Sequence, residues 1–193
     1  MSEEIIRLLK QYRVIQDGHF LLTSGLHSDR YFEKFRILEH PQLCAWFANK
    51  IAHFFEKHKV DVVCGPTTGG VIVAYEVARQ LACRCVIAEK AEQGRKIGRG
   101  FSLGSKDRIL VVDDVLTTGS SINETVTAIQ HTGTQIIGVG VFIDRSAGVS
   151  FPLPFFAVYQ EPIQNFPPER CPLCRAGIPL TVPGRSGKGD RLT

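Results

Sequence analysis

Several features that define whole classes of protein are missing from this sequence of 193 residues. No stretch approaches the roughly 18 apolar residues of a membrane-spanning helix. The first ten residues, MSEEIIRLLK, contain early acids rather than the apolar run of a signal peptide. The formal net charge of +4 is too small to indicate nucleic-acid binding by itself. We therefore expect a cytoplasmic protein whose partners include neither membrane nor nucleic acid.

Six cysteines are present, and most of them lie in apolar surroundings. We expect these to be small buried hydrophobic residues in a reducing compartment. They are Cys44, Cys64, Cys83 and Cys85. Because 44% of the residues are hydrophobic, a chain of this length can bury a core without disulfides.

Hydrophobic patterning predicts strands that alternate with helices. Near-continuous apolar strands in such an alternation indicate a parallel sheet covered on both faces, with ligands at the carboxyl ends of its strands. Strands are expected at 60–65, 85–88, 108–112, 135–144 and 154–159, and helices at 3–16, 41–58, 69–82 and 121–133. Residues 17–37 form a turn-rich, strand-like stretch, and residues 89–104 are a polar, glycine-rich connection.

One stretch, RILVVDDVLTTGSSINE, carries most of the functional signal. Asp113 and Asp114 close an apolar strand, and Ser121 and Glu124 have the spacing of a capping box at the start of the next helix. The helix start and Gly119 offer backbone N–H groups to an anion. Hydroxyl donors between the strand and the helix are Thr117, Thr118, Ser120 and Ser121. The loop thus suits a phosphate group, and the two carboxylates beside it suit sugar hydroxyls or a divalent cation. A sugar 5-phosphate carries both kinds of group, so we expect such a ligand.

Two other interpretations of this stretch were compared. Aspartates often begin turns, so the pair could be purely structural, but adjacent acids repel one another and favour a compensating ligand or cation. A nucleotide-binding loop of the Gly-x-x-x-x-Gly-Lys-Ser/Thr type is absent.

The stretch ILVVDDVLTTGSSI resembles the signature of type I phosphoribosyltransferases, which bind 5-phosphoribosyl-1-pyrophosphate (PRPP). GHFLLTSGLHSDRYFEK, GPTTGGVIVAYEVAR and ERCPLCRAGIPL resemble segments of the orotate phosphoribosyltransferases. The resemblance implies an α/β fold with a central, mainly parallel sheet flanked by helices and a small N-terminal hood. We expect a helix and hood in 1–40, a core in 41–165, and a Cys-x-x-Cys tail with a disordered end in 166–193.

The same resemblance implies the chemistry, in which orotate displaces pyrophosphate from PRPP with Mg²⁺ as cofactor. Asp113, Asp114 and Lys90 would be catalytic. PRPP would be bound by Asp113, Asp114, Val115, Leu116, Thr117, Thr118, Gly119, Ser120, Ser121, Lys90, Arg95, Lys96, Arg99, Thr68 and Gly69. Orotate would be bound by Thr117, Arg145, Thr23, Tyr31 and Phe32. A homodimer would share the basic loop between its active sites.

The sequence departs from the best-studied branch of this family at three places. Its mobile loop lacks a Lys-Asp-His-Gly run, and Gly69 and Thr23 stand where that branch has lysines. Transfer to a purine base and a PRPP-sensing regulator are the alternative functions. Arg145 and the hood segment argue against the first, and the small net charge without a helix-turn-helix module argues against the second.

Cys171 and Cys174, in the stretch RCPLCRAG, have the spacing of half a structural zinc site. A full site needs two further ligands, and the sequence has no second Cys-x-x-Cys pair. Two subunits could pool their pairs, the thiols could form a redox or disulfide pair, or the tail could turn here without metal. No metal ligands are assigned from the sequence.

Overall fold

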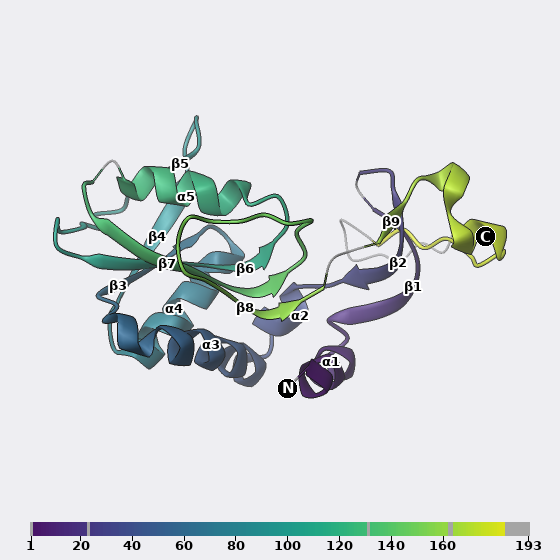
Figure 1. The fold of residues 1–193 in the computed structure, drawn as a ribbon, viewed down its shortest axis with the longest axis horizontal. Helices are drawn as coiled ribbons and strands as arrows, with labels where there is room; N and C mark the ends of the chain where they lie inside the picture. Colours follow the sequence, from purple (N-terminus) through teal and green to yellow (C-terminus); the bar gives the residue numbers. More distant parts are fainter. Residues whose placement is uncertain (1, 23, 131, 162–163, 184–193) are drawn as a thin grey trace. The chain divides into compact units, whose positions relative to one another are not determined.

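The computed structural model describes residues 2–22, 24–130, 132–161 and 164–183 (Figure 1). The chain forms two compact units, Ile37–Glu161 and the combination of Met1–Arg36 with Pro162–Thr193. Residues 184–193, which were expected to be disordered, lie outside the described residues.

The larger unit is built on a six-stranded sheet in the order β5-β4-β3-β6-β7-β8. Its pairings are parallel except that of β4 with β5. The strands are β3 (Val62–Pro66), β4 (Arg84–Lys90), β5 (Arg95–Ile97), β6 (Arg108–Leu116), β7 (Gln135–Asp144) and β8 (Phe155–Gln160). The helices are α3 (Pro41–Phe55), η1 (Glu56–His58), α4 (Gly69–Leu81) and α5 (Ser120–Gln130), and α2 (Phe35–Leu38) precedes them across the boundary of the units.

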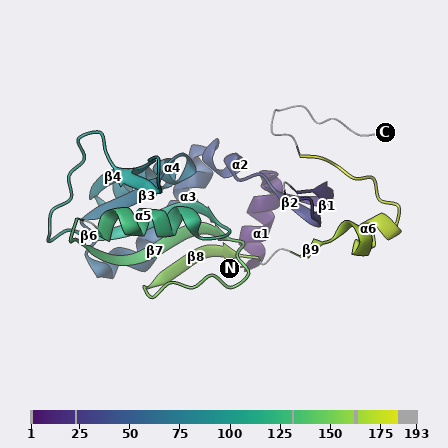
Figure 2. The same cartoon turned by 90° about the horizontal axis from the view of Figure 1, so that it is seen from above.

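Helices cover both faces of this sheet: α5 lies on one face, and α3 and α4 lie on the other (Figures 1 and 2). Alternate residues of each strand point to opposite faces, so the apolar strands fill both layers. Val62, Cys64 and Val111 belong to the cluster packed with α5. On the other face the rings of Phe47 and Phe142 have centroids 5.3 Å apart. This mainly parallel sheet confirms the predicted α/β fold class.

The smaller unit contains an antiparallel three-stranded sheet in the order β1-β2-β9. Its elements are α1 (Ser2–Gln11), β1 (Ile15–Leu21), β2 (His27–Phe32), β9 (Asn165–Phe166), η2 (Pro168–Arg170) and α6 (Pro172–Arg175). The hood segment and the Cys-x-x-Cys tail, remote in sequence, therefore share one unit. Within the described ranges, every helix falls short of the length and hydropathy that a bilayer span requires.

Three sequence-based expectations about the elements need correction. The strand predicted at 108–112 extends to Leu116, because β7 continues to pair with it as far as Asp144. The connection at 89–104 contains β5, a short strand that folds back on β4. The helix predicted at 3–16 ends at Gln11, before the backbone turns at Arg13 with φ of 54°.

The six cysteines are free thiols. Cys44 and Cys64 are buried as expected, whereas Cys83 and Cys85 are half-buried. Burial raises the pKa of Cys64 to about 12 and that of Cys44 to about 11. Because the thiolate is the reactive form, these two side chains behave as small hydrophobic residues.

An ion pair fixes the amino end of β6. Asp61 accepts hydrogen bonds from the backbone N–H and the guanidinium of Arg108, with Nε–Oδ2 at 2.9 Å. The side-chain hydrogen bond from Arg108 holds the pKa of Asp61 at about 2. A carboxylate with a lowered folded-state pKa stabilises the fold above its ordinary pKa, and this contribution is lost as the pH falls through the folded-state value.

Asp61→Asn is therefore expected to lower the urea midpoint at neutral pH, with a difference from the wild type that shrinks as the pH falls from about 4 toward about 2. Equilibrium unfolding of both proteins across this range measures it. A difference that stays constant with pH would show that ionisation of Asp61 is irrelevant to folding.

Candidate active site

The connections of the sheet create a crevice between β3 and β6. Strand β3 leads through α4 to β4 on one side, and β6 leads through α5 to β7 on the other. The strand order therefore reverses between β3 and β6, which is where ligands bind in open α/β sheets. Register between the two strands ends at the pair Cys64 and Val111, so the residues that follow on β6 lie beyond their pairing with β3.

Asp113 and Asp114 lie on β6 just beyond that point. Their exposed fractions are 7% and 3%, low values for carboxylates. Oδ1 of Asp113 accepts the backbone N–H of Asp114 at 2.9 Å, and Oδ1 of Asp114 accepts that of Val115 at 2.7 Å. These hydrogen bonds fix the orientation of the two carboxylates near the end of β6.

The carboxylates face the glycine pair that starts α4. A Cβ added at Gly69 would overlap with the carboxylate of Asp114, and one added at Gly70 would lie 2.9 Å from Oδ1 of Asp113. The absence of a lysine at position 69 therefore has a structural reason, because any side chain there would displace Asp114. The preceding Thr67–Thr68 peptide bond is cis, and Thr68 is exposed.

Gly69→Ala is expected to weaken PRPP binding by about 10–100-fold, because a displacement of one ångström in a binding group has effects of this order. Calorimetric titration with PRPP and Mg²⁺ measures the change. The matched control is Gly104→Ala, whose added Cβ would find its nearest neighbour, Oδ2 of Asp107, at an ordinary 3.5 Å. Equal affinity in both variants would show that the closeness of Gly69 and Asp114 has no role in binding.

A hollow at the end of β6 is lined by hydroxyls and backbone. It is bounded by Asp113, Val115, Leu116, Thr117, Thr118, Gly119, Ser120, Ser121 and Ile122. Gly119 has φ of 79°, a conformation that L side chains rarely adopt, which permits the turn into α5. The hydroxyls of Thr118 and Ser120 lie 2.9 Å apart. The start of α5 and these hydroxyls form a cradle suited to a phosphate group.

The predicted capping box at Ser121 and Glu124 is wrong. Helix α5 begins at Ser120, and the carbonyl of Gly119 accepts the first helical hydrogen bond, from the N–H of Asn123 at 2.9 Å. Ser121 and Glu124 both lie inside the helix, and their side chains contact Arg95 instead. The helix therefore starts one residue earlier than predicted, at the N–H groups next to the hollow.

Arg145 follows β7 directly beside this hollow. Its backbone N–H donates to the carbonyl of Leu116 at 2.9 Å, which ties it to the end of β6. Oδ1 of Asp144 accepts the N–H of Ser146 at 2.9 Å and fixes the turn. Arg145 is half-buried and follows the carboxyl end of β7. Strand β7 is the neighbour of β6, the strand that carries the two aspartates.

Residues 36–168 match the family described as phosphoribosyl transferase domain. An orotate phosphoribosyltransferase from Caldanaerobacter subterraneus is 42% identical over 184 residues, which are 95% of this chain and 97% of that relative. The chain belongs to the orotate phosphoribosyltransferase family. A solved family structure from Aeropyrum pernix has a TM-score of 0.70 at 23% identity, covering 81% of this chain and 93% of that one. Another, from Mycobacterium tuberculosis in complex with PRPP, has a TM-score of 0.66 at 24% identity, with 82% and 95% covered.

The basic residues that the family resemblance assigns to PRPP lie on the β4–β5 hairpin and just after it. Lys90 ends β4, and Lys96 lies on β5; both are exposed. Arg99 follows β5 with φ of 53° and forms an ion pair with Glu89. Two lysines of this hairpin are therefore available to an anionic ligand, and Arg99 is held by a carboxylate.

Arg95 differs from these residues because its side chain is only 3% exposed. Its Nη1 donates to the carbonyl of Ala88 at 3.1 Å and to the hydroxyl of Thr67 at 3.2 Å. Its Nη2 donates to the hydroxyl of Ser121 at 3.4 Å. The guanidinium therefore connects the loop after β3 with the first turn of α5.

The hood residues assigned to orotate lie in the smaller unit. Tyr31 is half-buried, with its ring centroid 5.6 Å from that of Phe20, and Phe32 is only 5% exposed. Thr23 lies outside the described residues. Phe32 is thus part of the buried apolar set, whereas Tyr31 keeps part of its surface accessible.

Sequence reasoning missed Gly70 and the bracing contacts of Arg95. The doubled glycine in TTGGVIV was a usable signal, since two glycines at a helix start indicate close approach of another group. Nothing in the sequence separates Arg95 from its basic neighbours, because its burial arises only when β5 folds back on β4.

Proposed function

We propose that this chain transfers the 5-phosphoribosyl group of PRPP to orotate, giving orotidine 5-monophosphate and pyrophosphate in pyrimidine biosynthesis. The supporting observation is the pair of buried carboxylates, Asp113 and Asp114, set between a glycine helix start and a hydroxyl-lined hollow. A sugar whose hydroxyls meet the carboxylates can place its 5-phosphate in that hollow. The close relative is named an orotate phosphoribosyltransferase, and one solved fold neighbour is a complex with PRPP.

The chain's own residues bind and align the reactants. Asp113 and Asp114 accept hydrogen bonds from the ribose hydroxyls, and the loop from Val115 to Ser121 surrounds the 5-phosphate. As the bond from ribosyl C1 to pyrophosphate breaks, a ring nitrogen of orotate forms the new bond at C1, and the proton of that nitrogen passes to the departing pyrophosphate. Because positive charge develops on the sugar, the two carboxylates stabilise the transition state.

The leaving pyrophosphate requires hydrogen-bond donors and cations. Thr68 and the backbone at Gly69 line one side, and we assign Lys90 and Lys96 to the other side, with Arg99 joining when it leaves Glu89. Arg95 supports the site as a positioning residue, since its guanidinium is engaged with Thr67 and Ser121. Carboxylate oxygens are ligands that Mg²⁺ prefers, so Asp113 and Asp114 fit this cofactor. Bound Mg²⁺ supplies neutralisation of pyrophosphate charge.

Arg145 is assigned to the carboxylate of orotate, with which a guanidinium can pair bidentately. Thr117, beside it at the end of β6, is the second contact to the base. Tyr31, Phe32 and Thr23 of the hood stay predictions from the family resemblance.

We further assign a homodimer in which exposed basic residues of each β4–β5 hairpin serve the partner's site, while the buried Arg95 braces the site of its own chain. The hairpin is exposed and basic, and α4 carries exposed apolar side chains, with Ile72 at 42% and Tyr75 at 65%. Sedimentation of the wild type should give the mass of two chains.

The decisive test is a spectrophotometric assay of orotate consumption with PRPP and Mg²⁺, run beside adenine and hypoxanthine. Of the three bases, we expect turnover with orotate and none with adenine or hypoxanthine. Turnover with a purine and none with orotate would establish the alternative base, and tight, strongly salt-dependent RNA or DNA binding without turnover would indicate a regulator.

A further inference from the structure

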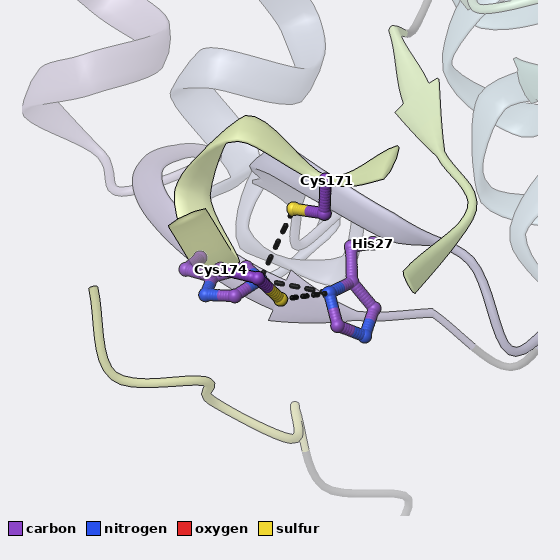
Figure 3. A group of neighbouring side chains, drawn as sticks. His27, Cys171 and Cys174 are labelled. Atoms are coloured by element: carbon purple, nitrogen blue, oxygen red, sulfur yellow. Dashed lines mark hydrogen bonds between the residues drawn. The ribbon is translucent and has the colours of Figure 1, made fainter. Parts of the chain in front are cut away.

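Four side chains of types that can ligate a metal converge in the smaller unit, whereas the residues assigned to catalysis belong to the larger one. His19 lies on β1 and His27 begins β2. Cys171 is the N-cap residue of α6, and Cys174 lies within that helix. One ligand atom from each lies within 4.8 Å of every other. In Figure 3 the thiol of Cys174 points toward the ring of His27, and the thiol of Cys171 belongs to the same group of side chains. The two ligands that the sequence analysis could not find are thus the histidines.

The spacing of these atoms fits a tetrahedral ion. A zinc ion with bonds of about 2.0–2.3 Å holds its four ligand atoms roughly 3.3–3.8 Å apart. Sγ of Cys174 lies 3.3 Å from Nδ1 of His27 and 3.7 Å from Nε2 of His19. Sγ of Cys171 lies 3.5 Å from Nε2 of His19, and the two ring nitrogens are 2.9 Å apart. A small outward shift of the two rings, together with a shortening of the longest separation, which is at most 4.8 Å, would complete the tetrahedron.

The protonation of His19 is set by a neighbour outside the cluster. Its Nδ1 lies 2.8 Å from the carbonyl oxygen of Ile178, which can only accept a hydrogen bond. Nδ1 therefore carries the proton, and Nε2 presents its lone pair to the thiols. A carbonyl that orients a histidine in this way is the usual outer partner of a metal-ligating imidazole.

Backbone pairing holds the cysteine segment over the histidines from both sides. Before the cysteines, β9 pairs with β2 so that Phe166 stands opposite His27. After them, the N–H of Thr181 donates to the carbonyl of His19 at 2.7 Å, and the N–H of Leu21 donates to that of Thr181 at 2.9 Å. The ligand set is therefore fixed by the backbone. Three of its side chains are buried, and Cys174 is exposed, which leaves a path for an ion to enter.

We propose that His19, His27, Cys171 and Cys174 bind one zinc-class divalent ion within a single chain, as a structural site. Two thiolates and two imidazoles are the mixed sulfur and nitrogen set that zinc prefers, and four protein ligands leave no open position for catalysis. The ion joins the C-terminal segment to the β1–β2 hairpin, although Cys171 follows His27 by 144 residues in the sequence.

A metal ion that joins segments distant in sequence suits the smaller unit, because its apolar core is limited. Among the residues of this unit that the structure describes, the buried hydrophobic ones are Ile5, Leu9, Val14, Ile15, Phe20, Phe32 and Cys171. Small units with few buried apolar side chains commonly depend on metals or disulfides for stability. Binding of the ion to the folded form alone would stabilise that form by mass action.

The test is metal analysis of untagged, reduced full-length protein, because tag histidines would bind zinc themselves. We expect about one zinc per chain in the wild type and in the control Cys83→Ser, and less than about 0.1 in Cys171→Ser and His27→Gln. After exchange for Co²⁺, the wild type should show thiolate charge-transfer absorption and the intense visible bands of tetrahedral cobalt. A chelator should lower Tm by at least about 5 °C in the wild type and leave Cys171→Ser unchanged.

PRPP binding by each variant, measured by calorimetry, reports that residues 37–161 are folded and separates loss of metal from loss of the protein. The proposal is overturned if wild-type protein that binds PRPP holds no zinc and gives Co²⁺ the spectrum of the aqueous ion. It is equally overturned if Cys171 and Cys174 form a disulfide in metal-free native protein, or if Cys171→Ser and His27→Gln keep the wild-type zinc content.

Discussion

Asp113→Asn lowers kcat/KM for PRPP by about 10²–10³-fold in the assay of orotate consumption, because a neutral amide cannot stabilise positive charge developing on the ribose. Asp114→Asn is expected to act in the same direction. Both side chains are almost completely buried, so the change in charge is weakly screened by water. Circular dichroism should show that the folds are intact.

Asp61→Asn is the matched control, since it makes the same substitution beside the opposite end of β6. Asp61 contacts Arg108 at the start of the strand, whereas Asp113 lies near its end. We expect its turnover to stay within about threefold of the wild type. Equal losses in Asp61→Asn and Asp113→Asn would mean that the effect comes from the fold of β6, and full activity in Asp113→Asn would remove its assigned role.

Arg145→Ala raises KM for orotate by about 100-fold, because the carboxylate of the base loses a bidentate, charge-assisted partner. KM for PRPP should change by less than about threefold, since the residues proposed to bind its ribose and phosphate lie on β6 and α5 and in the loop between them. Initial rates with each substrate varied in turn measure the two constants separately.

Uracil, which is orotate without its carboxylate, makes this test specific. The wild type should strongly prefer orotate to uracil. Arg145→Ala should lose most of that preference, because its activity falls with orotate and stays unchanged with uracil. If the variant loses activity equally with both bases, Arg145 serves the turn after β7 and does not recognise the carboxylate.

The fold was predictable where one local pattern decides the structure. Apolar runs separated by helical stripes placed β3, β7, β8 and α4 to within two residues. The hydrophobic pattern gave wrong bounds where pairing with a segment distant in sequence decides the structure. Strand β6 continues past its apolar run because β7 pairs with Val115 and Leu116, and β5 exists because the three residues 95–97 fold back on β4.

The residues of the candidate site divide in the same way, into those that a contiguous stretch of sequence predicts and those that only tertiary contacts bring together. The signature stretch predicted the aspartates and the hydroxyl loop, since these residues are contiguous. It did not reveal that Gly69 has no room for a side chain, because the Asp114 carboxylate comes from another strand. The histidines beside Cys171 and Cys174 were missed for the same reason: β1, β2 and the tail meet only through tertiary pairing.

Calorimetric titration of the wild type with PRPP in the presence of Mg²⁺ addresses the proposed pocket most directly, and Asp113→Asn and Gly104→Ala should be titrated beside it. We expect one PRPP per chain for the wild type and for Gly104→Ala, and no measurable heat for Asp113→Asn. Absence of heat from wild-type protein that is folded by circular dichroism would contradict the pocket and every role assigned around it.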